Sequence, residues 1–488
     1  MELIFEKSSE DKRGIKLPHS DVPQAAALEK QYLRTGTTGL PNISEPEVVR
    51  HYTCLSRTNF CIDTNFYPLG SCTMKYNPRF TEKIACIDSF ASIHPLQPQL
   101  VKGGILTQGA LQVIYDLERQ LSEITGMHSF TTQPMAGAHG ELTGVMLIAA
   151  WHKSRGDKRE YIIIPDSGHG TNPASAAIAG YKVKTIKSDK NGVMDMEEYR
   201  KALDGKTAGI MLTCPNTLGI FNPHIKEITE LAHSSGALMY YDGANLNAIL
   251  GKARPGDLGF DIVHLNLHKT FSTPHGGGGP GAGPVGVTKE LAEFLPTSRI
   301  IMRDDGTYAL EYQKPSSIGY ISPFYGNFGI LLRAYAYILY MGRDGLIEAS
   351  ENAVLNANYL KSRLRERFNI PFPDGTLHEF VISAKNFADG GVRALDFAKA
   401  LIDRGIHPPT VYFPLNVREA IMVEPTETES KETLDNFIEE MIKLADLAES
   451  SPKIFHNFPA TTPVCRPDEV AAVKNPDLRY RVGSQSQL

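Results

Sequence analysis

The sequence predicts an α/β protein with a mostly parallel sheet covered by helices on both faces, followed by a smaller C-terminal α+β domain. Short apolar runs suited to buried strands recur at residues 161–164, 209–213, 237–241 and 262–267. Segments with helical spacing of apolar residues separate these runs. Strands of a parallel sheet are buried on both faces and therefore appear as continuous apolar runs, so this alternation indicates such a sheet.

The segments on either side of the sheet differ from it in character. Residues 1–100 contain eight prolines, which interrupt any long helix and predict an irregular arm that wraps another surface. An amphipathic helix follows over 111–124, with Gly126 as its stop. The C-terminal elements expected after the sheet are a helical stretch around Gly329–Gly342, a strand at 377–383, and helices at 394–404 and 430–449. The expected domains are an arm of residues 1–100, a large domain of 101–335, and a small domain with a tail of 336–488.

Composition and charge exclude several classes of protein. The 488 residues are 42% hydrophobic and 22% charged, which excludes disordered, collagen-like and disulfide-scaffold proteins. The net charge is −5 and no long Lys/Arg run is present, so neither nucleic acid nor an anionic membrane is expected as a partner. Six cysteines without a CxxC pair, together with the lack of a signal peptide or a spanning apolar run, predict a cytoplasmic protein with reduced thiols.

A lysine follows the last of the apolar runs. Lys269 lies in the segment LNLHKTF, and the glycine run 276–279 comes soon after it. A lysine at the mouth of a buried sheet is desolvated, which makes its amine a nucleophile toward aldehydes. Taken alone, Lys269 is also compatible with a solvated strand end, and the glycines with a flexible turn.

An acidic residue, Asp242, ends the apolar run that precedes the lysine. By itself, a carboxylate followed by Gly is often a turn former. A pyridinium cofactor needs a Schiff-base lysine at one end and an acidic partner for its ring nitrogen at the other. Two adjacent strands of one sheet can hold both groups, so Lys269 and Asp242 together predict a site for such a cofactor.

Two further segments carry candidate site residues. QPMAGAHGE contains Ala136, Gly137 and Ala138 and enters a helix, whose free N–H groups and dipole favour a phosphate. His169 follows the first strand in DSGHGTNPAS, where an imidazole can stack on a planar ring or move a proton near neutral pH. Taken alone, the first segment is also compatible with a tight turn before a helix, and the second with a hydrogen-bonded loop histidine.

Together these segments resemble the glycine cleavage system P-protein family, the glycine dehydrogenases (decarboxylating), which are pyridoxal-phosphate enzymes of fold type I. The match begins at 56–59 (SRTN) and 63–78 (DTNFYPLGSCTMKYNP), and includes QPMAGAHGE, GHGTNPASA and LNLHKTFSTPHGGGGPG. It resumes at 422–429 (MVEPTETE) and 461–464 (TTPV), so it covers nearly the whole chain. Some members are one chain of twice this size and others are split into two subunits. The length and the retained Lys269 imply the second, or β, subunit.

The resemblance implies a role for each candidate residue. Lys269 is the Schiff-base lysine, Asp242 the ring-nitrogen partner and His169 the ring-stacking residue, and these three are the expected catalytic residues. Asn266 takes the position where many relatives carry Ser or Thr toward the phosphate. No metal is expected. The residues implied to bind pyridoxal 5'-phosphate, all within the large domain of 101–335, are Lys269, Asp242, His169, Ala136, Gly137, Ala138 and Asn266.

The resemblance also implies a reaction and its partners. Glycine is decarboxylated with release of CO₂, and the aminomethyl group passes to the lipoyl arm of H-protein. The implied partners are subunit 1, in a heterotetramer of two copies of each subunit, and lipoylated H-protein.

Other motifs and two other functions stay open. The Gly70–Lys75 motif either lines the substrate site or belongs to a subunit-wrapping arm, and Thr426 with Glu429 predicts a helix capping box rather than a functional carboxylate. The chain is alternatively a different fold-type-I enzyme without a lipoyl partner, or a non-catalytic scaffolding subunit. A desulfurase needs a mobile cysteine, yet the next cysteine after the lysine is Cys465. Further histidines expected near the cofactor are His94, His139, His268 and His275.

Overall fold

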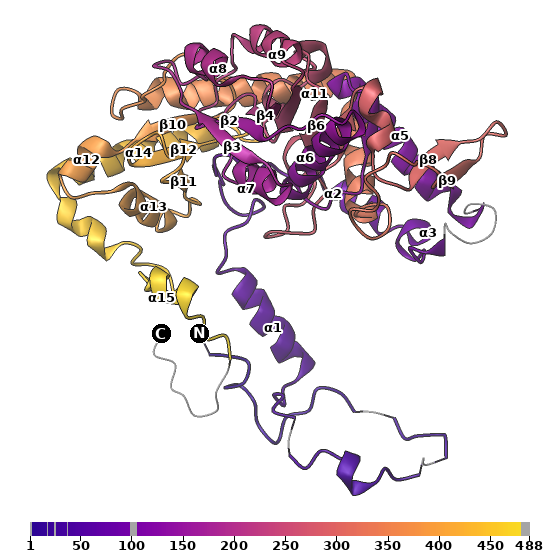
Figure 1. The fold of residues 1–488 in the computed structure, drawn as a ribbon. Coiled ribbons are helices and arrows are strands. Elements are labelled where there is room, and N and C mark those ends of the chain that lie inside the picture. Colours follow the sequence, from indigo (N-terminus) through magenta and orange to yellow (C-terminus); the bar gives the residue numbers. More distant parts are fainter. Residues whose placement is uncertain (1, 17, 24–25, 37, 98–104, 480–488) are drawn as a thin grey trace. The chain divides into compact units, whose positions relative to one another are not determined.

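The computed structural model describes residues 2–16, 18–23, 26–36, 38–97 and 105–479. The chain forms two compact units, which can be traced in Figure 1. The larger unit is Asn65–His456, and the smaller one combines Met1–Thr64 with Asn457–Leu488. The expected domain boundary between residues 100 and 101 lies outside the described residues, and the expected division after residue 335 stays a prediction.

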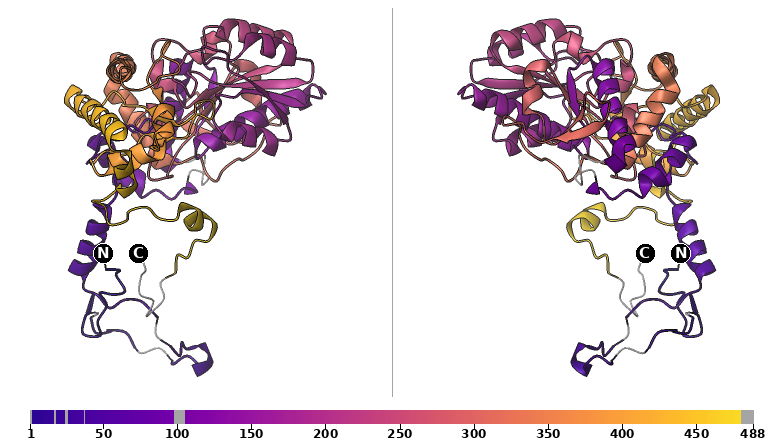
Figure 2. Two further views of the ribbon diagram at one scale, coloured as in Figure 1. Left: turned by 90° about the vertical axis from the view of Figure 1, so that its left-hand side faces the viewer. Right: turned by 90° about the vertical axis from the view of Figure 1, so that its right-hand side faces the viewer.

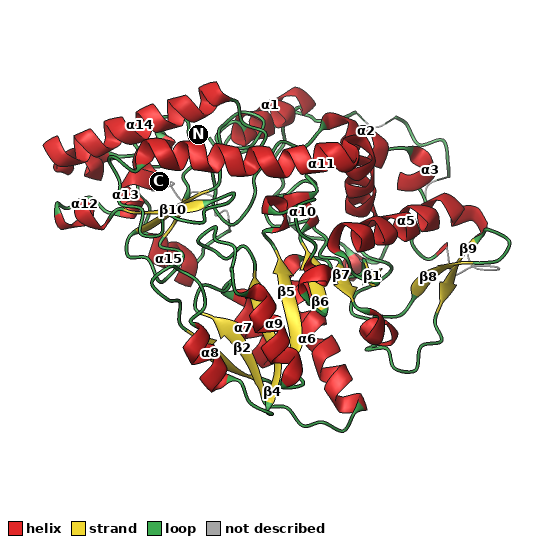
Figure 3. Cartoon of the chain, turned by 90° about the horizontal axis from the view of Figure 1, so that it is seen from above, coloured by secondary structure: helices red, strands yellow, loops and turns green. Residues whose placement is uncertain are grey.

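A seven-stranded sheet forms the centre of the larger unit (Figure 3). Its strand order is β1-β7-β6-β5-β4-β2-β3; β7 runs antiparallel to β1 and β6, while the pairs from β6 to β3 are parallel. The strands are β1 (Ser129–Thr131), β2 (Tyr161–Pro165), β3 (Lys182–Ile186), β4 (Thr207–Thr213), β5 (Leu238–Gly243), β6 (Ile262–Leu265) and β7 (Val285–Val287). The four strands predicted from apolar runs correspond to β2, β4, β5 and β6, which confirms the predicted fold class.

Helices cover both faces of this sheet, with α6 and α7 on one face and α8 and α9 on the other (Figures 1 and 2). The α-helices up to the end of the sheet are α2 (Arg79–Ala85), α3 (Asp88–Ala91), α5 (Gln108–Thr125), α6 (Gly137–Ser154), α7 (Thr171–Ile178), α8 (Met196–Ala202), α9 (Ile225–Ser234) and α10 (Leu267–Thr270). Short 3-10 helices are η1 (Lys30–Tyr32), η3 (Ile105–Thr107), η4 (Leu246–Ala248), η5 (Pro255–Leu258), η6 (Lys289–Phe294) and η7 (Pro452–Asn457). The predicted amphipathic helix is α5, which ends at Gly126 with a left-handed φ of 73°.

Alternate residues of the strands pack into two separate apolar cores. In β2, Ile163 belongs to one core, whereas Ile162 and Ile164 belong to the other. In β4, Leu212 and Met211 divide in the same way. Both faces of these strands are therefore buried, which explains why their sequence is continuously apolar.

The rest of the larger unit follows the sheet in sequence. A three-stranded antiparallel sheet of order β10-β12-β11 packs with helices, and β8 and β9 form a separate antiparallel pair. These elements are β8 (Arg299–Met302), β9 (Tyr308–Glu311), α11 (Phe328–Leu364), β10 (Phe380–Ser383), α12 (Lys385–Asp389), α13 (Ala394–Ile402), β11 (Thr410–Val411), β12 (Ala420–Val423) and α14 (Lys431–Ser450). The predicted strand at 377–383 and helices at 394–404 and 430–449 correspond to β10, α13 and α14. Element α11 is kinked at Gly342, where the φ of 60° is not helical, so it consists of two helical segments that meet at this residue.

The capping box predicted from Thr426 and Glu429 is wrong. Helix α14 begins at Lys431, and its N-cap is Ser430, whose side chain accepts a hydrogen bond from the Thr433 N–H. Thr426 instead has a left-handed φ of 65°. The Thr-x-x-Glu spacing of this segment is the same as that of a capping box, which is why the pattern predicts one here.

The smaller unit contains α1 (Glu45–Ser56) and α15 (Glu469–Lys474). Helix α1 lies where the prolines predict an irregular arm, and Ser44 and Glu47 form its capping box. Pro46 lies in its first turn, where the missing proline N–H has no intrahelical partner to lose, so Pro46 does not interrupt the helix. In the part of the chain that the structure describes, none of the helices has the length and apolar character needed to cross a membrane.

Candidate functional site

Lys269 lies in α10, immediately after the buried strand β6. Its side chain is almost fully enclosed, with 6% of the residue exposed. The Nζ atom donates a hydrogen bond of 2.6 Å to the carbonyl oxygen of Ser71. The structure therefore gives Lys269 the desolvated position that the sequence predicts for it.

Asp242 lies near the end of β5, which is the neighbour of β6 in the sheet. Its carboxylate accepts hydrogen bonds from Thr213 Oγ1 at 2.9 Å, the Ala244 N–H at 3.0 Å and Asn172 Nδ2 at 3.3 Å. Burial by itself raises the pKa of this carboxyl, but nearby histidines, the Ala244 N–H and Lys269 outweigh burial and lower the pKa below its usual value. Asp242 is therefore ionised at neutral pH.

His264 is a site residue that the sequence reasoning missed. It pairs with Asp242 in the β5–β6 register, and its Nε2 lies 3.4 Å from Asp242 Oδ1. The Tyr240 hydroxyl lies 2.6 Å from His264 Nδ1. Burial lowers the pKa of His264, although the Asp242 charge opposes this effect. The available signal was a histidine inside the otherwise apolar run IVHL.

His169 follows β2 and precedes α7, as the sequence predicts. Its Nδ1 lies 2.8 Å from Thr171 Oγ1, and that hydroxyl donates to Glu141 at 2.7 Å. Burial lowers the pKa of His169. Burial, together with the charge of Asp242, raises the pKa of Glu141 to about 7. Glu141 lies in the QPMAGAHGE segment, where no local pattern predicts a role for it.

The expected phosphate cradle lies at the start of α6. Ala136 is the N-cap of this helix, so the chain enters the helix at the position that the sequence predicts. A Cβ added at Gly137 would lie 2.2 Å from Asn266 Oδ1, and one at Gly283 would lie 2.1 Å from the Ala136 carbonyl oxygen. The backbone of residues 136–138 thus packs directly against Asn266 with no room for side chains at the two glycines.

The residues present fit a pyridoxal-phosphate cofactor. A buried amine, an ionised carboxylate and a helix N-terminus are the three features that an aldehyde, a ring nitrogen and a phosphate require. Buried polar atoms without a partner among the described residues offer further hydrogen bonds to a bound polar group. These atoms are Asn172 Oδ1, Thr270 Oγ1 and Thr273 Oγ1.

The Gly70–Lys75 motif contacts Lys269 directly. We call residues 70–77 the strap, because their hydrogen bonds join the Lys269 segment to the segment that follows β12. On the lysine side, Ser71 accepts from Lys269, and Asn77 Nδ2 donates to the Ser272 carbonyl at 2.8 Å. On the other side, the Tyr76 N–H donates to Thr428 Oγ1 at 3.2 Å.

Lys75 anchors the strap through a buried ion pair. Its Nζ donates to Glu427 Oε1 at 2.7 Å, the Thr270 carbonyl at 2.8 Å and Asn247 Oδ1 at 3.0 Å. Burial by itself lowers the pKa of Lys75, but the Glu427 charge raises it above the usual value. Glu427 lies within the predicted capping-box segment, so this segment does carry an ion-paired carboxylate. The sequence could not show this, because 352 residues separate the partners.

The four further histidines lie in three places. His268 and His275 lie beside Lys269, with ring centroids 4.8 Å apart, and burial together with the Lys269 charge lowers the pKa of His268 to about 3. His139 lies in α6, and its Nδ1 accepts the Met135 N–H at 3.2 Å. His94 is exposed and lines a different cavity of about 480 Å³.

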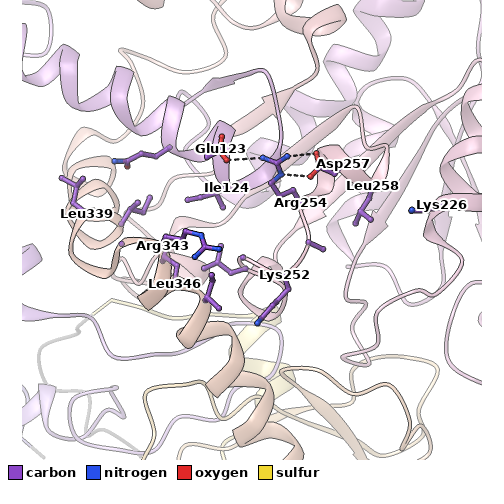
Figure 4. A pocket seen from close by; sticks show the side chains of 17 residues that line it. Glu123, Ile124, Lys226, Lys252, Arg254, Asp257, Leu258, Leu339, Arg343 and Leu346 are labelled. Atoms are coloured by element: carbon purple, nitrogen blue, oxygen red, sulfur yellow. Dashed lines mark hydrogen bonds and ion pairs between the residues drawn. The ribbon is translucent and has the colours of Figure 1, made fainter.

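A larger cavity of about 880 Å³ lies apart from Lys269, between α5, residues 250–258 and α11. Figure 4 shows Arg254 in its wall, where it forms ion pairs with Glu123 and Asp257. The buried titratable residues Lys269, Asp242 and His169 lie at the ends of the strands and do not line this cavity.

Comparisons with known proteins agree with this geometry. Residues 349–453 match the family described as glycine dehydrogenase, C-terminal domain, and residues 140–297 match aminotransferase class-V. A solved glycine decarboxylase (P-protein) of the glycine cleavage system, in inhibitor-bound form, superposes with a TM-score of 0.70 at 21% identity, over 86% of this chain and 93% of that one. A cysteine desulfurase from Escherichia coli gives a TM-score of 0.61 at 13% identity, over 79% and 96%. These two likenesses show the fold.

Two curated relatives are similar over nearly their whole length. One from Bacillus licheniformis is 55% identical over 482 residues, or 98% of each chain. One from Listeria monocytogenes is 55% identical over 485 residues, or 99% of this chain and 98% of the relative. Both are named "Probable glycine dehydrogenase (decarboxylating) subunit 2". With this identity over its full length, the chain belongs to the glycine dehydrogenase (decarboxylating) subunit 2 family.

Proposed function

We propose that this chain is the lysine-bearing subunit that decarboxylates glycine with pyridoxal 5'-phosphate. The observation that carries the proposal is the pair of buried groups, Lys269 and Asp242, on neighbouring strands of the sheet. The relatives named for this reaction are 55% identical to the chain, which supports the choice of glycine over other substrates.

In this proposal each site residue has one task. The Lys269 amine holds the cofactor, the ionised Asp242 keeps a proton on the ring nitrogen, and His169 packs its imidazole on the ring. Residues 136–138 and Asn266 receive the phosphate at the N-terminus of α6. Once bound, pyridoxal phosphate supplies a ring that accepts the electron pair left on glycine when CO₂ departs. The lowered pKa of Asp242 suits its task, because a neutral carboxyl would not hold the ring proton.

We further propose the partners and the location of the protein. The aminomethyl group is transferred to the lipoyl arm of H-protein, and the chain assembles with subunit 1 as a heterotetramer of two copies of each. The subunit number in the relatives' name supports a partner subunit, and the solved glycine decarboxylase is titled as part of the glycine cleavage system. The six free thiols are in keeping with a reducing, cytoplasmic location.

The first test is an absorbance spectrum of the purified chain with added cofactor, followed by borohydride reduction and peptide mapping. We expect a cofactor band and a reduced adduct on Lys269. Lys269→Ala should lose the adduct, whereas Lys252→Ala, at an exposed lysine, should keep it. If no band forms even with subunit 1 present, the proposal is wrong and a scaffolding subunit becomes the better explanation.

The second test adds subunit 1, lipoylated H-protein and carboxyl-labelled glycine. We expect labelled CO₂ to be released only when all three proteins are present. Release at the same rate without H-protein would instead indicate a fold-type-I decarboxylase that needs no lipoyl partner.

A further inference from the structure

Three buried side chains form a polar cluster beside the strap, and the proposed reaction does not use them. His378, Glu379 and Glu424 are each at most 1% exposed. The His378 Nε2 atom lies 3.8 Å from Glu379 Oε1 and 4.0 Å from Glu424 Oε1. Neither ring nitrogen of His378 has a hydrogen-bond partner among the described residues. A cluster this deeply buried needs a way to balance its charge.

The two carboxyl groups are linked to Lys269 through the strap. Glu379 Oε2 accepts the Ser71 N–H at 2.8 Å, and Glu424 Oε2 accepts the Thr73 N–H at 3.0 Å. Ser71 in turn accepts the Lys269 amine on its carbonyl oxygen at 2.6 Å. Each carboxyl therefore fixes one backbone amide of the segment that receives the lysine. Ser71 and Thr73 both have left-handed backbones, with φ of 68° and 42°, so the strap adopts this path at a conformational cost that the hydrogen bonds offset.

Among the described residues, the titratable groups that face the pair are Lys269, Cys72, His378 and Glu427. Burial lowers the pKa of His378 to about 3, so its ring is neutral. Burial raises the pKa of the Cys72 thiol, which is therefore also neutral.

Lys269 is thus the cation that acts on the pair, and one cation does not compensate two buried carboxylates. Burial and the charge of Glu424 raise the pKa of Glu379 well above its usual value. Burial raises the pKa of Glu424 to about 7. Two coupled carboxyls of this kind titrate as a unit, with one ionised while the other keeps its proton.

We propose that Glu379 and Glu424 are a positioning pair for Lys269: they share a single proton at neutral pH and hold strap residues 71–73 so that the Ser71 carbonyl orients the lysine amine. When Glu424 ionises near neutral pH and Glu379 keeps the remaining proton, a negative charge appears near Lys269 and changes the electrostatic field at that lysine. The inference rests on the proposed function only in taking Lys269 as the cofactor anchor.

The shared proton is tested first in the cofactor-free protein, by infrared difference spectroscopy of the protonated carboxyl C=O stretch. We expect a band that weakens as the pH rises through the neutral range, because Glu424 loses its proton there while Glu379 keeps its own, and this change should be missing in Glu424→Gln. Glu118→Gln is the matched control, because burial raises the pKa of that carboxyl to about 8 outside the cluster. This variant should remove a different band. If the same pH-dependent change persists in Glu424→Gln, or if the purified protein holds one equivalent of a divalent metal, the proposal is overturned.

The positioning role is tested by titrating the cofactor absorbance of the reconstituted protein with pH. A Gln side chain still accepts the strap N–H but cannot ionise, so both Gln variants should bind cofactor normally, and Glu424→Gln should lose the spectral step near pH 7. Glu379→Ala and Glu424→Ala also lose the hydrogen bond, and their cofactor affinity should fall about tenfold or more. A purely structural role would leave the spectral step unchanged in Glu424→Gln, and that result would contradict the proposal. The infrared result stands even if glycine proves not to be the substrate, so the two proposals can fail separately.

Discussion

Asp242 and Glu424 are two equally buried carboxyls, both within reach of the Lys269 charge, whose pKa values are shifted in opposite directions. Asp242, on the strand side of the site, accepts hydrogen bonds from Thr213, Asn172 and the Ala244 N–H. The pKa of its carboxyl is lowered. Glu424, on the strap side, accepts the Thr73 N–H and faces a second carboxyl, and its pKa is raised to about 7.

Burial alone therefore does not set the charge of a group in this site. Desolvation opposes ionisation of both carboxyls, and the donors and charges around each one decide the outcome. The strand side is organised around a fixed negative charge that can hold a ring proton. The strap side is organised to share and release a proton.

The largest expected effect concerns the anchor of the strap side. Lys75→Met leaves Glu427 buried without its partner, and removing one member of a buried ion pair costs about 3–5 kcal/mol of unfolding free energy. Glu427→Leu should destabilise similarly, because it leaves the Lys75 charge buried without its partner. The double variant Lys75→Met/Glu427→Leu should recover much of the loss, because it leaves no unpaired charge. Denaturant unfolding measures all three, and additive losses in the double variant would show that the ion pair does not anchor the strap.

On the strand side, Asp242→Asn should lower kcat by about 10²–10³, the usual cost of removing one preorganised electrostatic group. The amide keeps the size of the side chain but cannot hold a proton on the ring nitrogen. Borohydride trapping on Lys269 should persist, which separates loss of turnover from loss of cofactor. Thr213→Val is the control, because it removes one hydrogen bond and leaves the charge. A kcat for Asp242→Asn close to that of Thr213→Val would show that the negative charge of Asp242 is not needed for turnover.

The opposite pKa shifts also predict opposite effects of pH on stability. The folded-state pKa of Glu424 lies above its usual value of 4.5, so the folded protein binds the proton more tightly than the unfolded chain. Stability from this group is present below pH 4.5 and is lost as the pH rises toward 7, by up to about 3 kcal/mol. Asp242, with a lowered pKa, instead contributes stability that is lost on acidification.

Glu424→Gln should therefore match the wild-type protein near pH 4.5 and exceed its stability at pH 8. Unfolding curves at the two pH values measure this difference. Asp242→Asn should show the reverse trend, with its deficit largest at neutral pH. Parallel pH curves for wild type and Glu424→Gln would refute the raised pKa of Glu424.

The two sides also differ in how far the sequence predicts them. Lys269, Asp242 and His169 all lie at the ends of strands that the apolar runs reveal, and the carboxyl ends of parallel strands meet at one edge of a sheet. The segment that opens α6 is also predictable from local sequence, because small residues precede a run with helical spacing. Local sequence patterns therefore predict the sheet and the location of these residues at its edge.

The strap side depends on contacts between distant residues, which local patterns do not encode. Lys75 and Glu427 are 352 residues apart, and no periodicity links them. The Thr-x-x-Glu spacing even favoured a wrong capping box, because the same residue types serve both purposes. His378 and Glu379 lie just before a short strand and carry no motif at all. Pro46 contributes to the prediction of an irregular arm, but it lies in the first turn of α1, where a proline does not break a helix.

The smallest predicted effect concerns Glu141, which lies on the strand side but has a raised pKa of about 7 like Glu424. The Thr171 hydroxyl donates to Glu141 and meets His169 Nδ1, so Thr171→Val should break this link at a cost of about 1 kcal/mol, a five- to tenfold fall in kcat/KM. The hydroxyl stabilises the ionised form of Glu141, so its removal should raise the pKa of Glu141 further and move the corresponding limb of the pH profile of kcat/KM to higher pH. Thr171→Ser keeps the hydroxyl and should restore both quantities. A pH profile that is the same in Thr171→Val and wild type would mean that Glu141 does not communicate with His169, and that the strand side works through its fixed charge alone.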